Sequence, residues 1–211
     1  MAIQTTSNTA FAPKTDFALD TGRLHEKIEQ ALVEYAYRPL LTVARLTCHS
    51  ETTDIKTASA SAQRLAAYLR EDLGYAEGDV VAFQSPNCTS YIVSLLGVFL
   101  AGLKVTNVNP LYTAAETRRQ LKDSGARCVI GSTIFSEMIE EAVEGTSVDK
   151  VIAISVTDFF KPMTRAALNF LLRKVKKLDR PFQGAHSTLN EILSNRVVTE
   201  IDNFERVAAL D

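Results

Sequence analysis

Residues 78–132 read GDVVAFQSPNCTSYIVSLLGVFLAGLKVTNVNPLYTAAETRRQLKDSGARCVIGS, and this stretch decides the fold. Its short apolar runs at 80–84, 104–108 and 128–131 have the length and residue types of buried strands. Amphipathic helical patterns separate these runs from one another. The alternation predicts an α/β fold, a mainly parallel sheet with helices on both faces.

The same alternation continues on both sides of this stretch. A helix over 135–144 and a strand over 150–154 follow it, and a helix over 58–73, ended by Gly74, precedes it. Further along, Ser187 is the expected cap of a short helix over 187–194. We therefore expect four segments in the chain: a flexible lead (1–20), an α/β subdomain (21–157), a basic amphipathic helix (158–180), and a short helix and tail (181–211).

Composition excludes several classes of function. The 211 residues are 46% hydrophobic, which is enough for a sizeable core, and the net charge of -2 gives no reason to expect nucleic acid as a partner. The longest apolar run, 92–103, is too short to cross a membrane, and the N-terminus lacks the pattern of a secretory signal.

Cysteine and histidine spacing gives no sign of a metal site. The cysteines are odd in number and widely spaced, and the histidines form no ligand motif; they are Cys48, Cys88 and Cys128, and His25, His49 and His186. We expect no metal in this chain, no disulfide framework and a reducing, cytoplasmic location.

The loop NVNPLYT at 107–113 joins a strand to a helix. Thr113 and Glu116 have the spacing of a capping box, and Pro110 stiffens the turn before them. These three residues are therefore explained by local structure alone.

Two asparagines and a tyrosine in this loop, and Asn87 in the loop after the previous strand, are not explained so simply. Both loops follow strands that we expect to be parallel, and ligands of open α/β sheets bind at the carboxyl ends of such strands. Asparagine is also a common turn residue. The candidates for contact with substrate or with a neighbouring domain, or for turn formation, are Asn87, Asn107, Asn109 and Tyr112.

The same residues carry a resemblance to a known family. The Ala101–Leu103 segment AGL, the loop NVNPLYT and the run DSGARC at 123–128 occur in this order in long-chain fatty acid CoA ligases. The chain resembles the N-terminal region of these AMP-forming enzymes over about residues 35–205, and the loop favours the long-chain branch over other adenylate-forming enzymes.

This resemblance implies ATP-dependent activation of a fatty acid, followed by transfer to coenzyme A, with ATP, Mg²⁺ and coenzyme A as requirements of the full-length enzyme. The family's glycine-rich phosphate loop would follow Val207–Leu210, and the sequence ends at Asp211. The family's magnesium-binding glutamate, ribose-binding aspartate and adenylation lysine have no counterpart here. We therefore assign no catalytic residue and expect the chain to be inactive without the remainder of the ligase.

Positive charge is concentrated in one segment. Residues 158–180 contain seven Lys/Arg and two Asp, a net charge of +5, whereas the whole chain carries -2. Leucines at helical spacing form one stripe, and basic residues spread over the other side. This pattern is typical of a helix on an anionic membrane, or of a solvated helix that packs its leucine stripe on the domain. The candidate residues for peripheral membrane contact are Arg173, Lys174, Lys176 and Lys177.

Other interpretations of the whole chain remain open. The scaffold could serve as a non-catalytic module that binds lipid or a partner protein, or belong to a ligase for aryl or medium-chain acids. Half of a sheet-based enzyme would also expose apolar surface where the other half packs, and self-association is then expected.

Overall fold

The computed structural model describes residues 23–43, 51–175, 180–183 and 187–195. The expected lead (1–20) and the end of the expected tail, from residue 196 onward, therefore lie outside the described residues. The strands are β1 (Pro39–Val43), β2 (Glu51–Asp54), β3 (Val80–Gln84), β4 (Lys104–Asn107), β5 (Cys128–Ser132), β6 (Lys150–Ile154) and β7 (Ser187–Thr188). The α-helices are α1 (Leu24–Glu34), α2 (Ile55–Ala67), α3 (Thr89–Leu100), α4 (Ala114–Ser124), α5 (Ser136–Val143), α6 (Pro162–Phe170) and α7 (Leu189–Asn195).

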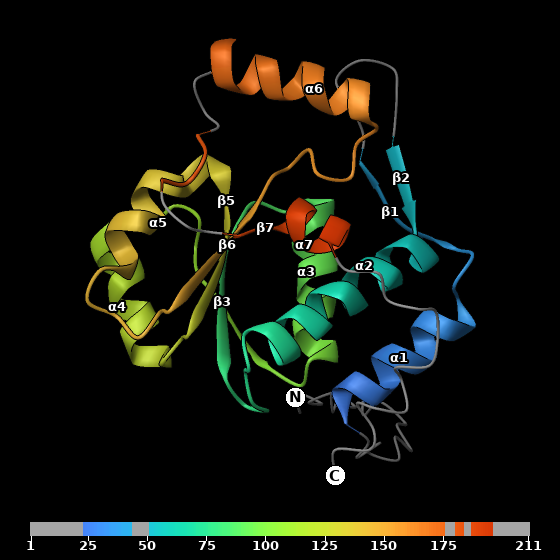
Figure 1. The fold of residues 1–211 in the computed structure, drawn as a ribbon, viewed down its shortest axis with the longest axis horizontal. Coiled ribbons are helices and arrows are strands. Elements are labelled where there is room, and N and C mark those ends of the chain that lie inside the picture. Colours follow the sequence, from blue (N-terminus) through green and yellow to red (C-terminus); the bar gives the residue numbers. More distant parts are fainter. Residues whose placement is uncertain (1–22, 44–50, 176–179, 184–186, 196–211) are drawn as a thin grey trace, which may run out of the picture.

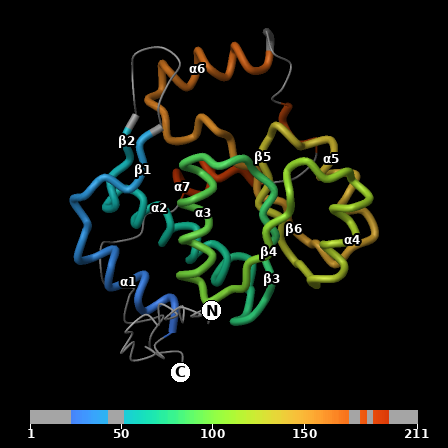
Figure 2. The backbone as a smooth tube through the Cα atoms, turned by 180° about the vertical axis from the view of Figure 1, so that it is seen from behind, coloured from blue at the N-terminus to red at the C-terminus, as the bar shows by residue number. Residues whose placement is uncertain are grey.

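A five-stranded sheet organises the chain, in the order β4-β3-β5-β6-β7, and every neighbouring pair in it is parallel. β1 and β2 form a separate antiparallel pair. Helices α4 and α5 cover one face of the large sheet, and α1, α2, α3 and α7 lie on the other (Figures 1 and 2). The predicted parallel sheet with helices on both faces is confirmed, and the predicted strands at 80–84 and 150–154 have the observed bounds.

The pleat of β3 explains why both faces are buried. Val81 and Phe83 belong to the core formed with α2 and α3, whereas Ala82 lies in the core formed with α4 and α5. All three side chains are at most 1% exposed. Since successive strand residues point to opposite faces, a strand covered on both sides must be apolar throughout.

Helices α2 and α3 cross closely on this sheet. A Cβ atom at Gly97 would lie 2.8 Å from the carbonyl oxygen of Ala62 and 3.0 Å from Cδ2 of Leu65. Only glycine fits such an approach without displacing the backbone of the neighbouring helix. Gly97, which merely interrupts an apolar run in the sequence, is thus the contact point of the two helices.

The ends of α2 follow recognisable local rules. Asp54 caps its start, where the Asp54 Oδ1 accepts from the Thr57 amide at 2.7 Å. The helix continues into a π-helical turn (Tyr68–Asp72), after which Gly74 has φ +65°. Gly74 therefore stops the helix as its residue type predicts, and the helix begins at Ile55 rather than at 58.

Two predicted boundaries near the C-terminus are wrong. Ser187 does not cap a helix, because it pairs with Ile152 as part of β7; Thr188 takes the cap instead, and its Oγ1 accepts from the Glu191 amide at 3.2 Å. β7 and α7 thus belong to the α/β unit, which extends past residue 157.

The predicted basic helix over 158–180 is also shorter. Asp158 closes a turn by accepting from the Ser155 amide at 2.7 Å, and Pro162 stands at the first turn of α6. Proline favours this position because its missing N–H and fixed φ suit a helix start. The α-helix ends at Phe170 and gives way to a π-helical turn over Leu171–Val175.

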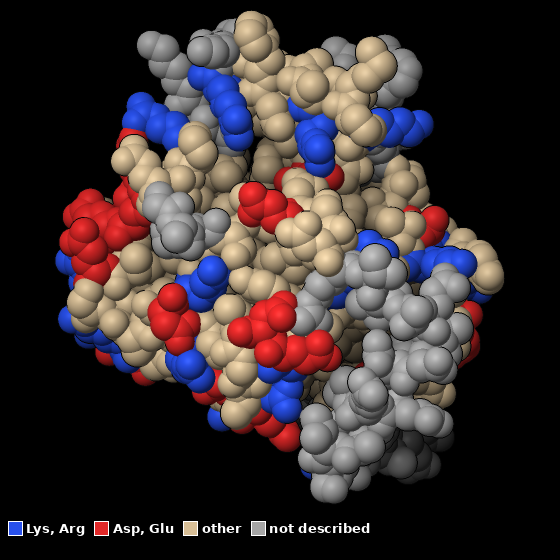
Figure 3. Space-filling view, viewed as in Figure 1, with Lys and Arg blue, Asp and Glu red and all other residues tan. Residues whose placement is uncertain are grey.

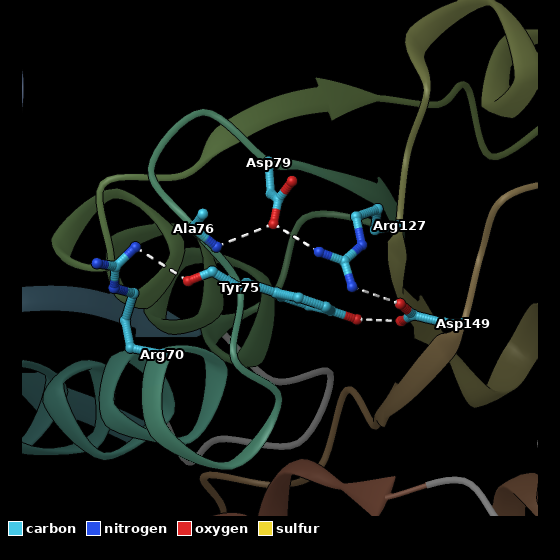
Figure 4. A network of polar contacts seen from close by, with 6 residues as sticks. All are labelled: Arg70, Tyr75, Ala76, Asp79, Arg127 and Asp149. Carbon is cyan, nitrogen blue, oxygen red and sulfur yellow. Dashed lines mark hydrogen bonds and ion pairs between the residues drawn. The ribbon is translucent and has the colours of Figure 1, made fainter.

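A charged network joins the amino ends of the neighbouring strands β3, β5 and β6 (Figure 4). Arg127 pairs with Asp79 at 2.8 Å and with Asp149 at 2.9 Å, and its guanidinium lies 4.6 Å from the ring centroid of Tyr75. The Tyr75 hydroxyl donates to Asp149. Burial is the main cause that raises the pKa of Tyr75, with Cys128 and Asp149 adding to it.

We expect Arg127→Ala to lower the free energy of unfolding by roughly 1–3 kcal/mol, because two carboxylates and a tyrosine ring lose one shared cation. Arg119→Ala is the matched control, since Arg119 pairs with Asp123 at 3.8 Å through side chains that are 86% and 71% exposed. Its cost should stay within about 0.5 kcal/mol. Urea unfolding of the parent chain and the two variants measures both losses. Equal losses would show that the Arg127 network contributes no more to stability than an exposed ion pair.

Candidate functional site

A groove of about 490 Å³ lies at the carboxyl ends of β3 and β4. It is formed where the loop after β3 meets the loop after β4. Its lining contains apolar, hydroxyl and amide side chains and no ionisable acid or base other than a tyrosine; the lining residues are Phe83, Ser85, Pro86, Asn87, Tyr91, Asn107, Val108, Asn109 and Pro110. The structure therefore brings three of the four predicted candidates, Asn87, Asn107 and Asn109, to one place.

Pairing of the two parallel strands positions the loops. The Val108 amide donates to the Phe83 carbonyl at 2.7 Å, one step beyond the last residue of β4. Tyr91, in the first turn of α3, packs edge-on against Phe83 with ring centroids 5.5 Å apart. The floor of the groove is thus fixed by backbone pairing and by an aromatic contact.

Asn107 is held by two neighbouring elements. Its Oδ1 accepts from the Tyr91 hydroxyl at 3.1 Å, and its carbonyl accepts from Gln120 Nε2 at 2.9 Å. Tyr91 contributes to the groove although sequence reasoning missed it. Its position in the first turn of the helix that follows the loop of Asn87 is the signal that could have revealed it.

Asn109 stabilises the turn after β4 with its side chain and its carbonyl. Its Oδ1 accepts from the Leu111 amide at 3.0 Å, and its carbonyl accepts from the Tyr112 amide at 3.1 Å. The capping box that follows is confirmed, because the Thr113 amide donates to Glu116 at 2.8 Å and Thr113 Oγ1 accepts from the Glu116 amide at 3.4 Å. These bonds to Thr113 lower the pKa of Glu116.

The other two candidates differ from these. Asn87 is exposed in the groove, and its side chain has no hydrogen-bond partner among the described residues. Tyr112 is 39% exposed and is not part of the lining. Of the four candidates, Asn87 is therefore the one whose side chain local structure leaves unexplained.

Gln84 is a buried polar residue next to the groove that the sequence interpretation passed over. It is fully buried at the end of β3, and its Nε2 donates to Thr117 Oγ1 at 3.1 Å and to the Asn109 carbonyl at 3.3 Å. It thereby ties the loop after β4 to α4. An amide at the end of an otherwise apolar strand was the available signal.

The groove can bind polar groups but cannot carry out acid–base chemistry by itself. No Lys or Arg in its lining could offset the charge of a triphosphate, and no carboxylate or histidine could move a proton. Among the described residues, no group of three or more His, Cys, Asp or Glu side chains is placed to hold a metal ion.

The second set of candidates lies on and beyond α6. Arg173 is exposed in the π-helical turn, Lys176 and Lys177 lie outside the described residues, and the side chain of Lys174 is not described either. In the described part of the chain, no helix is both long enough and apolar enough to cross a membrane.

A half-buried carboxylate connects α6 to the domain. Asp158 accepts from Asn190 Nδ2 at 2.5 Å, and Asn190 Oδ1 in turn accepts from Arg165 Nη1 at 3.1 Å. Burial raises the pKa of Asp158 to about 6, although the bonds from Ser155 and Asn190 and the charge of Arg165 act in the opposite direction.

We expect Asn109→Ala to lower the free energy of unfolding by about 1 kcal/mol, because the Leu111 amide loses its acceptor. Asn87→Ala should change it by less than about 0.5 kcal/mol, since its side chain has no described partner. Urea unfolding of both variants compares two asparagines of the same groove. A larger loss for Asn87→Ala would show that this residue is structural.

Asp158 predicts a pH dependence of stability. Its folded-state pKa of about 6 lies above the ordinary value of 3.8, so the folded protein binds this proton more tightly than the unfolded chain. The resulting stabilisation is fully present below the unfolded pKa and is lost as the pH rises through the folded pKa. Relative to Asp158→Asn, the parent chain should lose up to about 3 kcal/mol between about pH 4 and pH 7. Urea unfolding at both pH values tests this, and parallel pH profiles would refute it.

Comparison with known proteins identifies the family of this chain. Residues 44–188 match the model of the AMP-binding enzyme family. The chain is 36% identical over 155 residues to the long-chain-fatty-acid–CoA ligase of Salmonella typhimurium, which covers 74% of this chain and 27% of that ligase. It is 38% identical over 130 residues to the ligase of the same name from Haemophilus influenzae, covering 61% of this chain and 23% of that ligase.

Solved structures agree on the fold. A long-chain-fatty-acid-CoA ligase from Archaeoglobus fulgidus superposes with a TM-score of 0.62 at 16% identity, over 83% of this chain and 30% of that one. A luciferase-like enzyme from Zophobas morio superposes with a TM-score of 0.65 at 17% identity, over 87% of this chain and 36% of that one. The chain spans about a quarter of the length of the curated ligases it matches. Since the family match covers more than half of its residues, the chain belongs to the AMP-binding enzyme family and corresponds to an N-terminal part of its long-chain-fatty-acid–CoA ligases.

Proposed function

We propose that this chain forms the N-terminal scaffold of an ATP-dependent ligase that joins a long-chain fatty acid to coenzyme A. The similarity to ligases named for that substrate, at 36% and 38% identity, supports the assignment. In this proposal the remainder of the ligase is the main partner of the chain, and the location is cytoplasmic.

The chemistry of the groove is the observation that supports a scaffold role for this chain and a catalytic role for the remainder of the ligase. Its three asparagines and its tyrosine can donate and accept hydrogen bonds, but its lining holds no cation for phosphate. The sequence also contains no glycine-rich phosphate loop. We therefore assign ATP, Mg²⁺ and coenzyme A to the remainder of the ligase and no catalytic residue to this chain.

The groove itself is proposed to receive either the neighbouring region of the ligase or a polar part of its substrate. Asn87 is the residue best placed for this role, because its amide is exposed and has no described partner. Asn107 is the next, since Tyr91 occupies only its oxygen in the described contacts. Asn109 is committed to its turn through the Leu111 amide.

The test is ATP–pyrophosphate exchange with palmitate as the acid. The full-length ligase is expected to catalyse exchange that depends on Mg²⁺ and falls with short acids, whereas residues 1–211 alone should give only background. In the full-length enzyme, Asn87→Ala should change the exchange rate or the KM by a few-fold while Asn109→Ala acts mainly on stability.

Three outcomes would count against the proposal. Reproducible exchange by residues 1–211 would overturn the scaffold assignment. Preference of the full-length enzyme for an aryl acid over palmitate would overturn the substrate class. Unchanged kinetics in Asn87→Ala would remove the groove from the functional surface.

A further inference from the structure

Gln84 is a polar side chain at a position where the fold otherwise uses apolar ones. The other residues of β3 are valine, alanine and phenylalanine, and Gln84 at the carboxyl end of this strand is fully buried. Its Oε1 has no hydrogen-bond partner among the described residues. Burial of an unpaired amide oxygen opposes folding, and an apolar side chain of similar size would avoid this cost. Packing alone therefore does not account for Gln84.

The amide nitrogen of Gln84 connects the groove to the helices behind it. Gln84 Nε2 donates to the Asn109 carbonyl at 3.3 Å and to Thr117 Oγ1 on α4 at 3.1 Å. The Thr117 hydroxyl donates in turn to Met138 Sδ on α5 at 3.6 Å. The reversed orientation of the amide would place Oε1 against the Asn109 carbonyl oxygen, so these bonds fix which end of the amide faces the loop. Gln84 is thus a bridge from β3 and α4 to the loop after β4.

The Asn109 carbonyl is the point at which this loop turns. It also accepts from the Tyr112 amide at 3.1 Å, so Gln84 Nε2 and the Tyr112 amide share one acceptor. A carbonyl oxygen has two lone pairs, and both are then used. The side chain of Asn109 meanwhile accepts from the Leu111 amide at 3.0 Å. A shift of the Asn109 carbonyl would therefore move the turn as a whole.

A second glutamine holds the start of the same loop. Gln120 Nε2 on α4 donates to the Asn107 carbonyl at 2.9 Å and to Thr106 Oγ1 at 3.0 Å. Asn107 and Asn109 are the two asparagines that this loop contributes to the groove, and a glutamine amide holds the backbone carbonyl of each. The lining segment 107–110 is therefore fixed at two carbonyls by side chains from outside the loop.

The position of Gln84 favours a neutral donor. Figure 3 shows Lys, Arg, Asp and Glu side chains dispersed over the surface of the visible face, where water solvates them. Position 84 is fully buried, and a charged group there would lose its hydration. An amide supplies a donor to the Asn109 carbonyl without bringing a charge into the core.

We propose that Gln84 is a positioning residue of the ligase reaction, which holds the lining segment 107–110 in the arrangement that a polar part of a substrate requires. This inference rests on the proposed function of the groove, and it commits the groove to a substrate rather than to the neighbouring region of the ligase. Gln84 acts through the Asn109 carbonyl and does not itself line the groove. Its loss should therefore weaken binding of that substrate and leave the chemical step almost unchanged.

The first test observes the loop directly and needs no ligase activity. Gln84→Met keeps the approximate length of the side chain and removes the amide. In residues 1–211 carrying this change, the Leu111 and Tyr112 amides should exchange with deuterium at least about threefold faster than in the parent chain. Nuclear magnetic resonance resolves both amides, and their rates are compared with those of β5 amides in the same sample. This comparison removes the effect of any change in overall stability.

Two further variants accompany Gln84→Met. Gln63→Met is the matched control, because Gln63 Nε2 donates to Ser59 Oγ at 3.2 Å within α2, away from the groove. It should leave exchange of the two loop amides within about twofold of the parent chain. Thr117→Val removes the anchor of Gln84 on α4 and should speed exchange of the same amides, so it tests the bridge even where Gln84→Met does not fold. Circular dichroism checks the fold of each variant.

The second test measures KM and kcat of the full-length ligase for palmitate, ATP and coenzyme A. Gln84→Met should raise the KM of one of these substrates at least about threefold, while kcat changes by less than about twofold. Asn87→Ala should raise the KM of the same substrate, because both residues would act through one groove. Gln63→Met should leave all constants within about twofold of the parent enzyme.

Unchanged exchange of the loop amides in Gln84→Met, or in Thr117→Val where the first variant does not fold, would overturn the positioning role itself. Faster exchange with unchanged KM values, or with a fall in kcat alone, would show that Gln84 holds the loop without serving substrate binding. If Asn87→Ala raises a KM and Gln84→Met does not, this inference fails and the proposed function of the groove stands. If neither variant changes a KM, both fail.

Discussion

Hydrogen bonding of β3 on both of its edges is the constraint on which the rest of the structure depends. β4 and β5 both pair with it in parallel, so Val81 is opposite Val105 on one side and Cys128 on the other. Parallel neighbours need long crossover connections, and these place α3 and α4 on opposite faces of the sheet. The strand is thereby buried on both faces, and the loops that follow β3 and β4 must meet at one edge.

The two edges of the sheet have different chemistry as a consequence. The amino ends are joined by Arg127 and its two aspartates, which connect three separate segments of the chain. The carboxyl ends carry amides, hydroxyls and prolines without a charged side chain in the groove. The ion pairs at the amino ends thus lie opposite a groove whose described lining carries no charged side chain.

The sequence predicts the sheet well because its strands are short, apolar and separated by clear helical periods. β3 and β6 have the predicted bounds, and Thr113 with Glu116 forms the predicted capping box. Three asparagines meet at the groove because parallel strands bring their ends together, a consequence of topology that needs no side-chain detail. Whether they contact substrate stays a prediction.

Features that depend on distant contacts could not be predicted in this way. Ser187 and Thr188 have no strand pattern of their own, and they form β7 only because Ile152 and Ala153 offer a free edge. The buried Gln84 needs Thr117 from another helix, and the inward turn of Arg165 needs Asn190. Periodicity gives the faces of a helix but not which one the domain covers, and α6 illustrates the difference.

The close crossing of α2 and α3 at Gly97 has a consequence for the order of folding. The two helices are separated by little more than one strand in sequence, and the core they form includes β3 and extends to β5 and β6. The contact between α2 and α3 itself uses only residues that precede β4, β5 and β6 in the chain. During synthesis this unit can therefore collapse around β3 while later residues are still being added, and it offers them a surface already in place.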